Sequence, residues 1–179
     1  MNDERAAAEP VPNDRFPTAK MGRWLLGWLS VVLTQAATAN PVSTEHVTAR
    51  LLAEQTEFVP GQEIELALVL DIRPGWHTYW ANPGDSGEPT RLDWGLPAGL
   101  DAGPIRWPYP ELIRVGPLAN YGYSDRAVHL TSVATPADWP QGQPAEIAVS
   151  ASWLVCEEHC IPEGAELRLS LPSTPGPAV

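Results

Sequence analysis

Large apolar residues recur at every second position along several segments of this chain, and this period of two constrains the fold more than any other feature. Residues 63–68, Glu-Ile-Glu-Leu-Ala-Leu, show the pattern. Side chains of a strand point alternately to the two faces of a sheet, so such a segment buries one face and exposes the other. After residue 39, no stretch of twelve residues has the 3.6-residue period of a helix. The sequence therefore predicts an all-β domain.

Seven segments have the pattern of strands, and proline- and glycine-rich turns separate them. The predicted strands are 46–53, 62–72, 76–80, 91–94, 127–134, 145–154 and 165–171. Strands of this length joined by short turns favour an antiparallel β-sandwich. Residues 104–123 carry four aromatic residues among prolines and glycines. We expect an irregular loop there, which either binds a partner or covers one end of the core.

The first 39 residues have the pattern of a targeting segment. Lys20 and Arg23 precede an apolar stretch over residues 24–33, and Ala37-Thr38-Ala39 is a small-x-small cleavage site. The stretch is about half of the roughly 20 residues that span a bilayer. We expect a signal peptide cleaved after Ala39, with an uncleaved anchor helix as the alternative. The expected divisions are an extension and signal peptide over 1–39, a sandwich domain over 40–172 and a proline-rich tail over 173–179.

The charge of the chain excludes some functions. Eleven lysines and arginines against 22 aspartates and glutamates give a formal net charge of -11. Such a chain repels phosphate backbones, so we expect no nucleic-acid partner. The sequence contains neither Gly-x-Ser-x-Gly nor His-Glu-x-x-His, so hydrolase chemistry has little support.

The two cysteines, Cys156 and Cys160, have three residues between them in the segment W-L-V-C-E-E-H-C-I-P-E. A strand, a three-residue turn and a second strand would place them opposite each other, with about 4.5–5.5 Å between Cα atoms. That separation suits a disulfide, which an exported protein can keep. A bridge across so short a loop adds about 2 kcal/mol of stability or less. We therefore favour a redox-active pair over a structural one.

Five motifs of the domain resemble the N-terminal periplasmic domain of DsbD-type thiol:disulfide interchange proteins, especially the variety linked to suppression of copper sensitivity. They are P-G-W-H-T-Y-W at 74–80, N-P-G-D-S-G at 82–87, R-W-P at 106–108, N-Y-G-Y at 120–123 and the cysteine segment at 153–163. The resemblance covers roughly residues 45–172. It implies an immunoglobulin-like sandwich, located in the periplasm, that takes part in a thiol:disulfide oxidoreductase system without a cofactor. It also implies links to cytochrome c biogenesis and copper tolerance.

The resemblance further implies roles for individual residues and partners. Cys160 matches the cysteine that bonds to the partner's sulfur, and Cys156 matches the one that resolves this bond. Thioredoxin-like periplasmic domains are the implied electron donor and acceptors. A membrane electron-transfer domain accompanies this domain in the family, but no spanning segment follows Leu171. We therefore expect a fragment, a truncated gene product or a stand-alone domain.

Family members shield the cysteine pair with an aromatic cap loop, and the match is incomplete here. Asn120 stands where the cap carries phenylalanine, and the cysteines of known members are spaced more widely. We expect the loop around Tyr121 to lie over the pair. The residues expected to shield the pair and meet the partner are Tyr121, Tyr123, Trp76, Tyr79 and His159.

Two alternatives from other classes stay open. The first is a periplasmic copper-handling module, because cysteine and histidine are ligands that copper accepts. Its candidate ligands are Cys156, Cys160, His159, His46, His77 and His129, although the sequence assigns no metal site. The second alternative is a non-catalytic scaffold whose disulfide is structural, for which a very low reduction potential would be typical.

Overall fold

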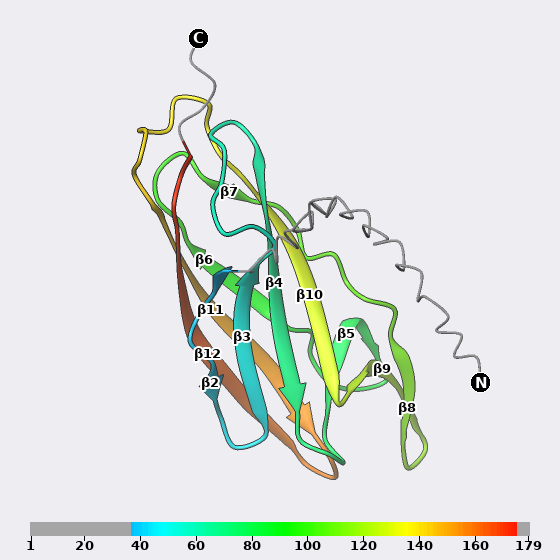
Figure 1. The fold of residues 1–179 in the computed structure, drawn as a ribbon. Helices are drawn as coiled ribbons and strands as arrows, with labels where there is room; N and C mark the ends of the chain where they lie inside the picture. The colour runs from blue at the N-terminus through cyan, green and yellow to red at the C-terminus, as the bar shows by residue number, and fades with distance from the viewer. Residues whose placement is uncertain (1–36, 175–179) are drawn as a thin grey trace, which may run out of the picture. The chain divides into compact units, whose positions relative to one another are not determined.

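The computed structural model describes residues 37–174, which form strands and the turns between them (Figure 1). Two antiparallel sheets face each other and enclose one hydrophobic core. None of the described residues forms a helix long and apolar enough to cross a membrane. The all-β, immunoglobulin-like sandwich expected from the sequence is confirmed. Residues 1–36 of the expected extension and signal peptide over 1–39 lie outside the described residues.

The first sheet has the strand order β1-β3-β4-β10-β7, with β2 paired to β3 as well. Its strands are β1 (Ala37–Thr38), β2 (Val42–Ser43), β3 (Val47–Ala53), β4 (Glu63–Ile72), β7 (Asp101–Ala102) and β10 (Arg126–Ala134). Burial alternates strictly along β3, as its sequence pattern predicts. The inward side chains of this sheet supply one half of the core.

The second sheet has the strand order β12-β11-β5-β9-β8. Its strands are β5 (His77–Gly84), β6 (Arg91–Gly95), β8 (Glu111–Val115), β9 (Leu118–Ser124), β11 (Ala145–Cys156) and β12 (Cys160–Leu171). One side of β11 pairs with β12 over its whole length. Its other side pairs first with β6 and then, at Cys156, with β5. The end of β11 is therefore held between two strands.

The core gathers the inward-facing residues of both sheets. Its largest fully buried aliphatic side chains are Leu51, Ile64, Leu66, Leu68 and Leu70 from the first sheet and Ile147, Leu167 and Leu171 from the second. These residues occupy alternate positions along their strands, so the outward positions remain for polar groups and for the cysteine pair.

The structure corrects two expectations about strands. The irregular loop expected over 104–123 is wrong for its second half, where β8 and β9 form a hairpin. Its prolines do not interrupt pairing, because Pro110 precedes β8 and Pro117 lies in the turn. Strand β12 begins at Cys160 rather than at residue 165. Pro162 is tolerated there because β12 is an edge strand, on which a missing N–H group leaves no ladder bond unmade.

The sandwich makes contacts slightly beyond the expected boundaries of 40 and 172. Ala37 and Thr38 pair with β3, and the Ala39 N–H group donates to the Leu51 carbonyl at 2.8 Å. At the other end, the Thr174 N–H group donates to the Phe58 carbonyl at 2.8 Å. Within the part of the chain that the structure describes, residues from 37 to 174 therefore form hydrogen bonds with the sandwich.

His129, on β10, is a polar residue buried in the core. Both of its ring nitrogens lack a hydrogen-bond partner, and the rings of Trp107 and Tyr123 pack edge-on against it. Burial lowers the pKa of His129 to about 4. The unfolded chain would protonate this residue near pH 6.5, whereas the folded chain resists protonation until about pH 4. Stability should therefore fall as the pH drops between these values.

We predict that His129→Phe makes the free energy of unfolding less sensitive to acid. Between about pH 7 and about pH 4.5, the variant should lose about 2 kcal/mol less stability than the wild type, because residue 129 no longer takes up a proton on unfolding. Urea titrations of both proteins at the two pH values measure the difference. An equal loss in both proteins would contradict the assignment of His129 as an acid-sensitive core residue.

Candidate redox site

The cysteines occupy the end of the hairpin between β11 and β12. Cys156 ends β11, Cys160 begins β12, and the two residues are directly paired, with 4.2 Å between their Cα atoms. They form a disulfide. The hairpin expected from the spacing is confirmed. The alternation along β11 buries Trp153 and Val155 in the core, so Cys156 and its partner lie on the opposite, outer face of the sheet.

The two cysteines differ in exposure because of their strands. Cys156 pairs with His77 of β5 on one side and with Cys160 on the other, and only 2% of its surface is exposed. Cys160 lies on the edge strand and is exposed. A thiolate approaching from solvent therefore meets Cys160 first.

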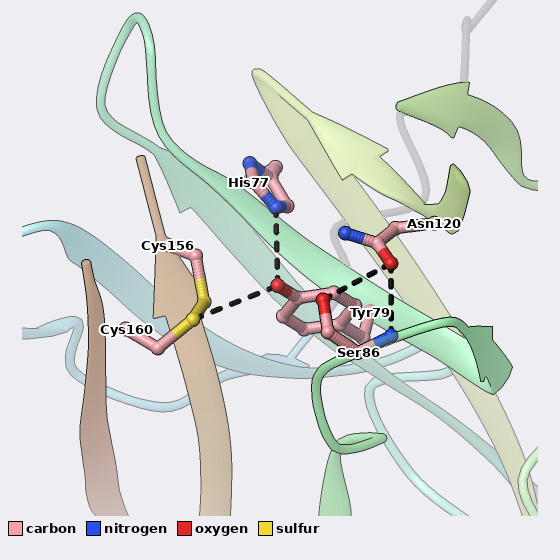
Figure 2. Close-up of a disulfide and its surroundings, with 6 residues drawn as sticks. All are labelled: His77, Tyr79, Ser86, Asn120, Cys156 and Cys160. Atoms are coloured by element: carbon pink, nitrogen blue, oxygen red, sulfur yellow. Dashed lines mark hydrogen bonds between the residues drawn. A yellow bond between two sulfur atoms is a disulfide. The ribbon is translucent and has the colours of Figure 1, made fainter. Parts of the chain in front are cut away.

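Tyr79 is the aromatic side chain that contacts the disulfide (Figure 2). Its hydroxyl lies 3.7 Å from Cys160 Sγ and 3.3 Å from His77 Nε2. His77 and Tyr79 are two residues apart on β5, so both point to the outer face, where Cys156 also lies. The Tyr79 ring is 1% exposed. The phenol is therefore held in one place beside the sulfur atoms.

The loop after β5 covers the Tyr79 ring. A Cβ atom at Gly87 would lie 2.2 Å from that ring, so only glycine allows this approach. The Asn120 Oδ1 atom anchors the loop by accepting hydrogen bonds from the Ser86 N–H group at 3.0 Å and the Ser86 hydroxyl at 3.1 Å (Figure 2). Asp85 Oδ2 accepts a further hydrogen bond from the Ala119 N–H group. Asn120 thus holds the loop that covers Tyr79.

Burial sets the protonation states beside the disulfide. Burial lowers the pKa of His77, and the negative charge of Glu111 opposes this shift. Burial raises the pKa of Tyr79, and the Ser86 hydroxyl offsets part of the rise. At neutral pH, His77 is therefore a neutral imidazole and Tyr79 keeps its proton. The site holds a hydroxyl donor without a fixed positive charge next to the sulfur atoms.

Two of the expected shielding residues lie on the other face of the sheet. Tyr79 is paired with Gly122, so the neighbouring Tyr121 and Tyr123 point away from the disulfide face. Tyr121 packs edge-on against Trp80, with ring centroids 6.4 Å apart. The Tyr123 hydroxyl donates to the Pro108 carbonyl at 2.9 Å. The structure therefore places Tyr121 beside Trp80, not over the cysteine hairpin as the sequence suggested.

Tyr121 instead lines a groove of about 870 Å³ together with Trp80, Trp107 and Tyr109. Tyr109 is 97% exposed, whereas Trp107 packs against the buried His129. The expected aromatic segment thus packs Trp107 and Tyr123 against the core and exposes Tyr109 and Tyr121 to solvent.

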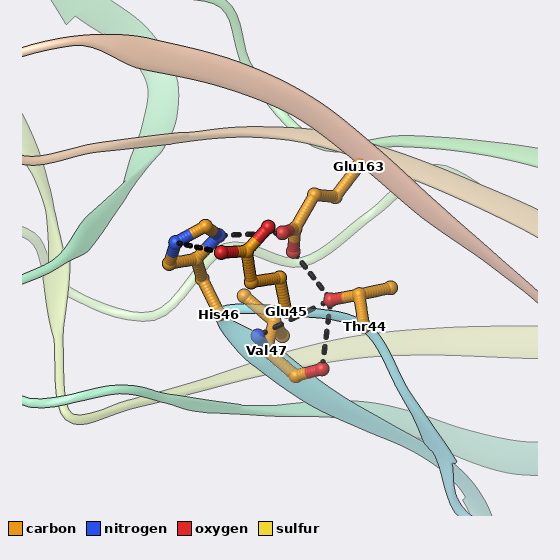
Figure 3. A network of polar contacts seen from close by, with 5 residues as sticks. All are labelled: Thr44, Glu45, His46, Val47 and Glu163. Atoms are coloured by element: carbon orange, nitrogen blue, oxygen red, sulfur yellow. Dashed lines mark hydrogen bonds and ion pairs between the residues drawn. The ribbon is translucent and has the colours of Figure 1, made fainter.

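Trp76 also lies away from the cysteines. Its ring stacks on His46, with centroids 3.7 Å apart. His46 Nδ1 lies 2.7 Å from Glu163 Oε1, and the Thr44 hydroxyl donates to the other oxygen of Glu163 (Figure 3). The exposed Glu45 lies 3.8 Å from His46 Nε2. This buried contact joins β12, three residues beyond Cys160, to the start of β3 in the opposite sheet.

The remaining predicted residues are also placed. His159 is exposed in the turn between the cysteines. The candidate copper ligands do not converge, since His46, His77 and His129 have separate neighbours. Within residues 37–174, no three histidine, cysteine, aspartate or glutamate side chains are arranged to share a metal ion.

Comparisons with known proteins agree with this site. The family described as "Thiol:disulfide interchange protein DsbD, N-terminal" matches residues 48–172, which include both cysteines. No curated protein matches the sequence significantly.

Two solved structures were found by comparison of the fold, with different degrees of similarity. The crystal structure of the N-terminal periplasmic domain of ScsB from Proteus mirabilis matches with a TM-score of 0.61 and 19% sequence identity, over 77% of this chain and 54% of that chain. This chain thus spans about half the length of that structure. The GAE domain of yeast GGA1 matches with a TM-score of 0.42 and 12% identity, over 75% of this chain and 98% of that chain.

The family match covers more than two thirds of the sequence, and a disulfide-bonded cysteine pair lies within it. The chain therefore belongs to the family of N-terminal domains of DsbD thiol:disulfide interchange proteins.

Proposed function

We propose that this domain relays reducing equivalents between thioredoxin-like proteins through the Cys156–Cys160 pair, in an oxidising compartment such as the periplasm. The unequal exposure of the two sulfur-bearing residues is the observation that supports this most. Exposing one of the two cysteines does not help a disulfide that only stabilises the fold. A thiol:disulfide exchange reaction, by contrast, needs one sulfur atom that a partner's thiolate can reach.

The reaction consists of two exchange steps. A thiolate of the reduced donor attacks Cys160 Sγ, a bond to the donor's sulfur forms, and the Cys156–Cys160 bond breaks. The electron pair of the broken bond goes to Cys156, which becomes a thiolate and takes a proton from water. A second donor thiolate then attacks the donor's own sulfur in the mixed disulfide and releases Cys160 as a thiolate. The donor is oxidised by two electrons, and the cysteine pair is reduced.

The reduced pair passes the same two electrons on. The Cys160 thiolate attacks a disulfide of the acceptor, and Cys156 then resolves the mixed disulfide. The domain is thus one component of a thiol:disulfide oxidoreductase system. The partners are proposed from the family, and the roles in cytochrome c biogenesis and copper tolerance stay predictions from the resemblance.

We predict that the two single-cysteine variants react at different rates. The probe is a thioredoxin-like protein whose single cysteine carries a coloured thionitrobenzoate leaving group, so that attack by a thiolate forms the mixed disulfide and releases the dye. Cys156→Ala keeps the exposed Cys160 and should release dye on the order of tenfold faster than Cys160→Ala, whose remaining thiol is buried. Equal rates would argue against the asymmetric relay.

We predict a midpoint potential for the pair above about −300 mV, the rough boundary below which disulfides are structural. Equilibration with glutathione or dithiothreitol buffers, followed by alkylation and gel separation, measures this potential. A potential far below the boundary would favour the scaffold with a structural disulfide.

We also predict that the exported protein begins at Asn40. Cleavage after Ala39 would remove β1, but β3 would keep its pairing with β2 and β4. Amino-terminal sequencing of the protein from the periplasmic fraction tests the prediction. An intact chain confined to the cytosol would contradict export.

A further inference from the structure

The Tyr79 hydroxyl lies between a histidine and the exposed cysteine, and no step above uses it. It is 3.7 Å from Cys160 Sγ and 3.3 Å from His77 Nε2 (Figure 2). A disulfide sulfur is a weak acceptor, whereas a thiolate is charged and accepts a much stronger hydrogen bond. The contact therefore gains strength when the disulfide is opened and Cys160 carries a negative charge.

We propose that Tyr79 donates a hydrogen bond to the Cys160 thiolate during exchange and that His77 orients the hydroxyl for this purpose. The inference rests on the proposed relay. In that relay, Cys160 is released as a thiolate from the mixed disulfide with the donor, and the same thiolate then attacks the disulfide of the acceptor. Tyr79 is then a catalytic residue, since it touches a reacting atom, and His77 is a positioning residue.

The protonation states fit this assignment. Burial raises the pKa of Tyr79, so the hydroxyl keeps the proton that it must donate. Burial lowers the pKa of His77, which therefore stays neutral. The Nε2–H tautomer of His77 donates to the phenol oxygen and leaves the hydroxyl proton free to point at sulfur.

The charged surroundings make such a donor necessary. The turn between the cysteines carries Glu157 and Glu158, whose negative charges disfavour a nearby thiolate, and His159, which favours one only when protonated. On the side of β8, Glu111 is the charge that acts on His77. Among the described residues near the cysteine pair, the Tyr79 hydroxyl is thus an uncharged hydrogen-bond donor surrounded mainly by negatively charged side chains.

The packing keeps the phenol in position. Gly87 contacts the ring so closely that a Cβ atom there would collide with it. The hydrogen bonds from Ser86 to Asn120 hold the loop that carries Gly87. A hydrogen bond whose donor is fixed beforehand requires little reorganisation when the charge develops.

The test measures the pH dependence of Cys160 reactivity without any protein partner. In the Cys156→Ala background, the rate of alkylation by iodoacetamide follows the thiolate fraction of Cys160. Tyr79→Phe should move the midpoint of this profile upward by about one pH unit, which corresponds to about tenfold less thiolate at neutral pH. His77→Phe should move it upward by a smaller amount, because the hydroxyl remains but is no longer oriented.

The matched control is Tyr121→Phe in the same background. It removes the same hydroxyl from the opposite face of the same sheet, beside Trp80, and should leave the profile unchanged. Unfolding curves of all variants should show that each is folded at the pH values used.

The possible outcomes separate the two proposals. An unchanged midpoint in Tyr79→Phe, or an equal shift in Tyr121→Phe, would overturn the role of Tyr79. An unchanged midpoint in His77→Phe would overturn the positioning role of His77. A shifted profile in a protein that exchanges with no thioredoxin-like partner would support the hydrogen bond and contradict the relay.

Discussion

The direct pairing of Cys156 with Cys160 across the β11–β12 ladder is the constraint on which the site depends. Twelve paired positions carry the ladder from Ala145 and Leu171 to the two cysteines. The register decides which residues of the two strands share a face, and a slip of β12 by one residue would turn Cys160 to the face opposite Cys156. Burial of the alternating aliphatic residues on both strands fixes that register. The hydrophobic core therefore determines where the sulfur atoms lie.

The same alternation divides the aromatic residues of the second sheet between two environments. Tyr79 belongs to the outer face, with the disulfide, and is covered by the loop that Asn120 anchors. Trp80 and Tyr121 belong to the other face and line the groove. Neighbouring residues in the motif Tyr79-Trp80 thus serve different surfaces.

Sequence patterns predicted the sandwich and the cysteine hairpin because both depend on local features. The period of two identifies strands, and a three-residue turn places its flanking residues opposite each other. The same period indicates that His77 and Tyr79 share a face. It does not indicate which face carries the disulfide, because that depends on the pairing of Cys156 with His77, 79 positions away in the chain. For this reason the sequence did not show that Tyr121 lies on the face opposite the disulfide.

Other features could not be predicted from the sequence. Some join residues that are far apart in the chain, and others lie in segments whose amino-acid composition is typical of another structure. The His46–Glu163 contact joins residues 117 positions apart, and no local pattern signals it. The β8–β9 hairpin lies in a segment whose proline and glycine content is typical of loops. The first part of β12 was not predicted because it contains Pro162. A proline within a strand is found mainly on edge strands, and whether a strand lies at an edge depends on the arrangement of the whole sheet.

The central claim is that a partner's sulfur bonds to Cys160 and not to Cys156. It can be tested on the wild-type protein by mixing its oxidised form with a reduced thioredoxin-like protein that lacks its resolving cysteine. After quenching in acid, cleavage on the carboxyl side of Glu157 or Glu158 separates the two cysteines into different peptides. Mass spectrometry should find the partner's peptide attached to the fragment that carries Cys160. Attachment to the Cys156 fragment, or no adduct in the presence of a competent donor, would contradict the account.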